Sequence, residues 1–115
     1  MPCALYGIPA DHLDAVAQRL GVALAWTFER RESSFWGPYS LHEGPDGGEI
    51  RIYYNEDPMY DSDSDPPQEQ YFEPDHHAYR VLVDAQLLSE GWLHCLGEAV
   101  RSEFPGSVLI RRRDA

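Results

Sequence analysis

Near the N-terminus, apolar residues recur at the spacing of one face of an α-helix. Asp11 is the expected N-cap, Asp14 adds an acid to the first turn, and Gly21 is the expected C-terminal stop. The pattern therefore predicts a helix between Asp11 and Gly21. The apolar face of this helix consists of Leu13, Val16, Ala17 and Leu20.

A second helical pattern lies near the C-terminus. Ser89 is a suitable N-cap, and Pro105-Gly106 ends the helix because proline does not continue it. The apolar face of this helix consists of Leu93, Leu96, Val100 and Phe104.

The other apolar segments are short and are typical of strands. The clearest is residues 78–84, and residues 49–54 alternate behind a turn signal at residues 45–48. Residues 29–42 are less regular, and we expect a turn there before an extended piece around Phe35–Leu41. The expected strands are residues 3–8, 22–28, 35–41, 49–54, 78–84 and 107–112.

The expected order is strand, helix, four strands, helix, strand. Two helices on one face of a mostly antiparallel sheet bury both apolar helix faces. The chain has 115 residues, of which 43% are hydrophobic. This length and content fit a single α+β domain over residues 1–115.

Features that direct a protein to a membrane or to an oxidising compartment are not evident. The first residues lack a basic segment and a long apolar segment, so we expect no signal peptide, and no apolar run reaches the length of a membrane span. Cys3 and Cys95 are far apart and form no metal or disulfide motif. We therefore expect two reduced cysteines and a cytoplasmic protein.

The charge of the chain is unevenly distributed. The formal net charge is −11, and residues 43–75 hold eleven Asp or Glu residues against Arg51 alone, a net of −10. This argues against nucleic acid and anionic membranes as partners, since both are bound by basic surfaces. Five prolines in the same third of the chain indicate an acidic loop at about residues 55–77 rather than a helix.

The acidic loop resembles a calcium loop only at its start. Asp61, Asp63 and Asp65 alternate as the first ligands of an EF-hand do. Such a loop needs Gly at position 6 and Glu at position 12, where this chain has Pro66 and Phe72. We therefore predict no metal site here, although weak surface binding of a cation stays open.

Catalytic motifs are also missing from the sequence. No serine lies in a G-x-S-x-G elbow, neither cysteine has the context of a catalytic thiol, and Gly47-Gly48 lacks the phosphate-loop context. We predict that the protein is not an enzyme and needs no cofactor.

Aromatic residues within the acidic loop point to protein binding. Tyrosine is enriched at interfaces because one end is apolar and the other forms hydrogen bonds. An acidic loop with aromatic anchors suits a basic protein surface. The predicted partner-binding residues are Glu56, Asp57, Asp61, Asp63 and Asp65 for charge and Tyr60 and Tyr71 for anchoring.

The segment Glu32–Tyr39 (ESSFWGPY), followed by Glu49–Asp57 (EIRIYYNED), resembles the small standalone immunity proteins of bacterial polymorphic toxin systems. The strands Tyr79–Ala85 and Leu109–Arg112 continue the resemblance, which spans residues 3–112. It implies a cytoplasmic protein that binds and neutralises one cognate toxin domain without catalytic residues. Because nuclease and deaminase toxins have basic clefts, the resemblance and the charge together predict that the acidic surface blocks such a cleft.

Two other functions remain open at the level of sequence. One is a small metal-dependent enzyme that uses Asp75, His76 and His77, although adjacent histidines in an extended segment point to opposite faces. The other is a housekeeping adaptor whose acidic loop only keeps it in solution.

Overall fold

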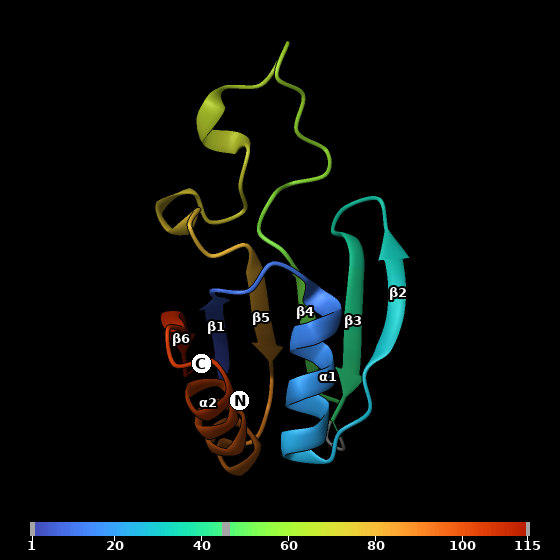
Figure 1. The fold of residues 1–115 in the computed structure, drawn as a ribbon, viewed down its shortest axis with the longest axis vertical. Helices are drawn as coiled ribbons and strands as arrows, with labels where there is room; N and C mark the ends of the chain where they lie inside the picture. The colour runs from blue at the N-terminus through green and yellow to red at the C-terminus, as the bar shows by residue number, and fades with distance from the viewer. Residues whose placement is uncertain (1, 45–46, 115) are drawn as a thin grey trace.

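The computed structural model describes residues 2–44 and 47–114 (Figure 1). The elements are β1 (Cys3–Ile8), α1 (Leu13–Leu24), β2 (Glu29–Ser33), β3 (Gly37–Glu43), β4 (Glu49–Tyr54), β5 (Val81–Gln86), α2 (Glu90–Glu103) and β6 (Val108–Arg113). The succession of strands and helices along the chain is the predicted one, although the second strand lies at different residues. Pro45 and Asp46 of the predicted turn lie outside the described residues.

The six strands form one sheet in the order β2-β3-β4-β5-β1-β6, and every neighbouring pair is antiparallel. Both helices lie on the same face of this sheet (Figure 1). The prediction of a single α+β domain with two helices on one face of an antiparallel sheet is therefore confirmed.

The main core lies between the helices and this face of the sheet. All four predicted apolar positions of α1 are buried there, as are Leu93, Leu96 and Val100 of α2. Burial of large apolar side chains stabilises such a core by roughly 1.5–3 kcal/mol each. Neither helix in the described part of the chain is long and apolar enough to cross a membrane.

The boundaries predicted for the first helix are wrong at both ends. His12, not Asp11, occupies the N-cap position, and it makes no side-chain cap. The helix continues past Gly21 to Leu24 and ends where Ala25 adopts a left-handed conformation with φ 55°. Gly21 instead allows a close approach, because a Cβ there would lie 2.9 Å from the Trp26 carbonyl oxygen.

The strand predicted over residues 22–28 is consequently absent. Its apolar character comes from the last turn of α1 and from Trp26, which reaches the core from the connection that follows. The next strand is β2, whose sequence ERRES carries no apolar pattern. This edge strand pairs only with β3, so charged side chains on both of its faces remain in water.

The opposite face of the sheet carries a smaller cluster without a helix above it. Its buried residues are Leu5, Tyr39, Leu41, Tyr53 and Leu82, and Trp36, Phe72 and Ile110 pack against them.

Ser89 caps α2 as predicted, since its hydroxyl accepts a hydrogen bond from the Trp92 amide at 3.4 Å.

Candidate functional site

The acidic loop, residues 55–77, joins β4 to β5 and protrudes from one end of the sheet (Figure 1). It lengthens a molecule whose dimensions are 44 × 28 × 27 Å. Two single turns of 3₁₀ helix, Pro67–Glu69 and Pro74–His76, interrupt its otherwise irregular course. The loop is therefore a distinct projection.

Asn55 fixes the base of this projection. Its side chain is fully buried, and Nδ2 lies 3.0, 3.1 and 3.3 Å from the carbonyl oxygens of His76, Tyr79 and Glu73. Oδ1 accepts a hydrogen bond from the Glu73 amide at 2.9 Å. One side chain at the end of β4 thus holds the returning limb of the loop, which is the segment that leads back to β5.

Backbone pairing continues this attachment outward. Glu56 and Tyr71 form an antiparallel bridge, and the Asp57 amide donates to the Gln70 carbonyl at 2.9 Å. The two limbs are therefore tied together before the chain reaches its outermost part.

We call residues 56–69 the acidic tip, and its carboxylates organise its own backbone. Oδ1 of Asp57 accepts a hydrogen bond from the Met59 amide at 2.9 Å, and Oδ1 of Asp61 accepts one from the Asp63 amide at 2.9 Å. Oδ2 of Asp65 accepts a bond from the Asp61 amide at 3.0 Å. These are local turns of the kind that aspartate forms with nearby backbone amides.

The acidic tip holds six carboxylates and no basic residue. Among the described residues, none of these six carboxylates lies within ion-pair distance of a basic group. Elsewhere, ion pairs hold ten carboxylates: Asp11, Asp14, Glu29, Glu43, Glu49, Glu73, Glu90, Glu98, Glu103 and Asp114. The negative field of the tip is therefore uncompensated within the described chain.

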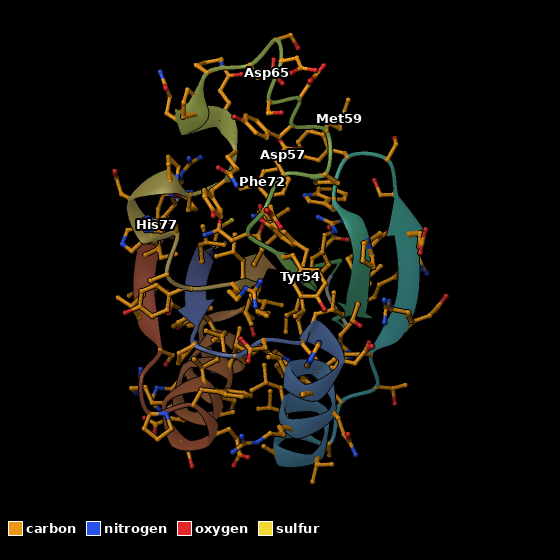
Figure 2. All side chains as sticks on the ribbon, turned by 45° about the horizontal axis from the view of Figure 1, so that its top comes forward. Tyr54, Asp57, Met59, Asp65, Phe72 and His77 are labelled. Atoms are coloured by element: carbon orange, nitrogen blue, oxygen red, sulfur yellow. The ribbon has the colours of Figure 1, made fainter. Side chains whose placement is uncertain are left out.

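The predicted partner-binding residues fall into three groups. Asp61, Asp63 and Asp65 lie together at the far end of the loop, and Asp65 is the uppermost of the residues labelled in Figure 2. Glu56, Asp57 and Tyr60 lie nearer the sheet. Tyr71 is on the returning limb, with its ring 5.8 Å from that of His77.

A groove of about 300 Å³ is lined by residues of the acidic tip, the turn before β3 and the facing ends of β3 and β4. Aromatic and proline side chains form most of its lining, and Glu56 and Asp57 supply its charge. Figure 2 shows Tyr54 below Asp57. The complete lining, which we call the aromatic groove, is Trp36, Pro38, Tyr54, Glu56, Asp57, Pro58 and Tyr60.

Trp36, Pro38 and Tyr54 are not among the partner-binding residues that the sequence predicts. Trp36 and Pro38 lie in the aromatic-rich segment ESSFWGPY, which spans the turn between β2 and β3, and its distance from the acidic tip in sequence concealed the contact. Tyr54 is the last residue of β4, two residues before the tip. A Cβ on Gly37 would lie 3.5 Å from the ring of Pro58, so this turn touches the loop.

The two histidines of the loop have different surroundings. His76 lies in a 3₁₀ turn with Nδ1 buried and without a hydrogen-bond partner, whereas Nδ1 of His77 lies 3.1 Å from the Pro74 carbonyl oxygen. Across residues 2–44 and 47–114, no three His, Cys, Asp or Glu side chains are placed to hold an ion. The geometry gives no support to the metal-dependent alternative.

A small polar cavity of about 160 Å³ lies on the helix-free face of the sheet. There the Tyr53 hydroxyl donates a hydrogen bond to Asp84 at 3.1 Å. Burial raises the pKa of Tyr53, and the adjacent Asp84 carboxylate raises it further. This phenol therefore holds its proton at neutral pH.

Comparisons with known proteins add no assignment. Neither the protein-family models nor the curated protein sequences contain a match to this chain.

Proposed function

We propose that this protein is an immunity protein that binds and neutralises a cognate bacterial toxin domain. The observation that carries the proposal is the acidic tip, which combines six unpaired carboxylates with a backbone held by its own hydrogen bonds. A protein binding surface is the function that this arrangement supports best, because it offers charge without catalytic geometry.

The mechanism is electrostatic attraction followed by steric blocking. A toxin that acts on nucleic acid has a basic cleft for phosphate groups, and the carboxylates of the acidic tip take the place of those phosphates. Opposite charge speeds association and disfavours wrong partners. The protruding loop then occupies the cleft, in the cytoplasm of the cell that makes both proteins.

The ordered base of the loop favours tight binding. Asn55 and the Glu56–Tyr71 bridge hold the two limbs together without a partner. A loop that is already ordered loses less conformational entropy on association, so more of the contact energy appears as affinity.

The test uses the full chain and the protein encoded beside its gene, which the proposal identifies as the toxin. One variant, the loop variant, neutralises five of the six carboxylates of the acidic tip: Glu56→Gln, Asp57→Asn, Asp61→Asn, Asp63→Asn and Asp65→Asn. A matched control neutralises five exposed carboxylates that pair with arginines elsewhere: Asp14→Asn, Glu29→Gln, Glu90→Gln, Glu98→Gln and Asp114→Asn.

We expect the wild-type chain to restore growth of cells that express the toxin. The loop variant should bind about tenfold or more weakly at low salt and lose most of its salt dependence, while the control should stay within about threefold of wild type. If the adjacent protein is not toxic, or if the wild-type chain does not bind it, the proposal is wrong.

A further inference from the structure

We propose that the aromatic groove is the receptor for an arginine side chain of the protein partner. The inference rests on the proposed function, since it names the group that the toxin inserts beside the acidic tip. The groove volume of about 300 Å³ is at the small end of the range for ligand pockets, which suits one long side chain.

The walls of the groove are held in place by contacts outside it. Ser33 Oγ accepts hydrogen bonds from the amides of Phe35 and Trp36, at 3.0 and 3.4 Å, and so fixes the turn before β3. The Trp36 ring meets Phe35 edge to face at a centroid distance of 5.2 Å. The Tyr54 side chain is held by a hydrogen bond outside the groove, since its hydroxyl accepts from the Leu13 amide at 3.3 Å.

The tip side of the groove is equally defined. The Tyr60 amide donates to the Asp57 carbonyl at 3.1 Å, and the Asp57 carboxylate accepts from the Met59 amide. The groove therefore needs little rearrangement to accept a side chain.

The chemistry of the lining favours a cation with a flat, weakly hydrated head. Glu56 and Asp57 are the charged residues of the lining, and no basic residue takes part in it among the described residues. Guanidinium stacks on aromatic rings and forms forked hydrogen bonds with carboxylates, whereas the compact lysine ammonium is more strongly hydrated. An arginine can satisfy the rings and the carboxylates of this groove together.

The protein already uses this interaction at the same aromatic cluster. The guanidinium carbon of Arg51 lies 3.9 Å from the Trp36 ring centroid and 5.5 Å from that of Tyr39. Arg19 stacks on Phe104 in the same way at 4.7 Å. The environment around Trp36 is thus compatible with a guanidinium, and the groove offers a second position for one.

The experiment titrates the full ¹⁵N-labelled chain with a nonapeptide of alternating glycine and arginine, followed by NMR. Matched peptides replace arginine by lysine or by the neutral isostere citrulline. We expect the arginine peptide to shift the Trp36 indole resonance and the amides of Asp57 and Tyr60. Lysine should bind more weakly, and citrulline should produce no shift.

Two substitutions locate the site on the groove. Tyr60→Ser removes one wall and should weaken binding of the arginine peptide by about fivefold. Met59→Ala is its control, because Met59 is 62% exposed on the same segment and does not line the groove. Asp57→Asn should weaken binding more than Asp63→Asn, which removes the same charge at the far end of the loop.

Equal shifts with arginine and lysine peptides, spread over the whole acidic tip and unchanged by Tyr60→Ser, would overturn the inference. This outcome is separable from a failure of the proposed function. If the toxin binds wild type and Tyr60→Ser equally well, the groove is not the arginine site, but the immunity function stands. If the arginine peptide binds at the groove but no toxin binds the protein, the groove inference stands and the proposed function is wrong.

Discussion

The acidic tip and the body of the domain use the same residue types for different purposes. Outside the acidic tip, ten carboxylates pair with arginines; in the acidic tip, Asp57, Asp61 and Asp65 accept hydrogen bonds from backbone amides instead. Most carboxylates outside the tip are therefore held in ion pairs, whereas the tip keeps its charge available and uses carboxylate oxygens to shape the loop.

The two regions also differ in what holds them together. Apolar side chains on both faces of the sheet are buried in the body, but none of residues 56–69 is buried. The loop consequently depends on hydrogen bonds at its base, while the body depends on packing. Substitutions in the two regions should separate these two sources of order.

The largest effect is expected for Asn55→Ala, because Asn55 connects the regions. The substitution removes a fully buried side chain and leaves buried backbone groups of the returning limb without partners. We expect unfolding to become easier by roughly 3 kcal/mol or more. Urea denaturation gives the free energy, and hydrogen exchange at the Phe72 and Glu73 amides reports the loop.

Gln68→Ala is the matched control for this prediction. It truncates an exposed amide side chain in the same loop, so its free energy of unfolding should stay within about 0.5 kcal/mol of wild type. An Asn55→Ala variant as stable as this control, with unchanged exchange at Glu73, would mean that the loop is held by something other than Asn55.

A smaller effect is expected for Gly48→Ala in the body. A Cβ at this position would lie 2.5 Å from the Leu87 carbonyl oxygen and 3.0 Å from that of Gln86. These are backbone atoms at the end of β5, so relief requires a shift of the chain. We expect a loss of about 1–3 kcal/mol in the free energy of unfolding.

Gly91→Ala is the counterpart in the first turn of α2. A Cβ there meets no atom within 4 Å, and alanine is the better helix former. The variant should equal wild type or gain up to about 1 kcal/mol. If both alanine variants behave alike in thermal unfolding, the close packing of Gly48 is not a constraint on the body.

Elements with one buried face, and helix ends with a strong capping residue, were predictable from the sequence. Burial of one face makes apolar residues recur at the spacing of a helix or a strand. The buried face of α1, the Ser89 cap and the strand at residues 49–54 are examples. The end of α1 was not predictable in this way, since Gly21 serves close approach to Trp26 rather than termination. Strand β2 was missed because an exposed edge imposes no apolar pattern.

The site was predictable in its charge but not in its architecture. Local composition places the carboxylates in one segment, and the structure brings three of them together at its far end. Trp36 and Asn55 belong to the site through contacts between segments far apart in sequence. A single sequence reveals such contacts only through a recognisable motif. The feature of this chain that comes nearest to such a motif is the asparagine that follows two tyrosines at the end of a strand.

The smallest effect on stability is expected where the effect on binding is largest. Asp61→Asn, Asp63→Asn and Asp65→Asn retain oxygen acceptors for the Asp63 and Asp61 amides while removing three like charges. The free energy of unfolding should change by no more than about 0.5 kcal/mol, with a slight gain from reduced repulsion. Because salt screens that repulsion, wild type should gain more stability than the variant between low and high salt in urea denaturation. A loss above about 1 kcal/mol would show that the charges themselves stabilise the tip, and the contrast between paired carboxylates in the body and available charge in the tip would fail.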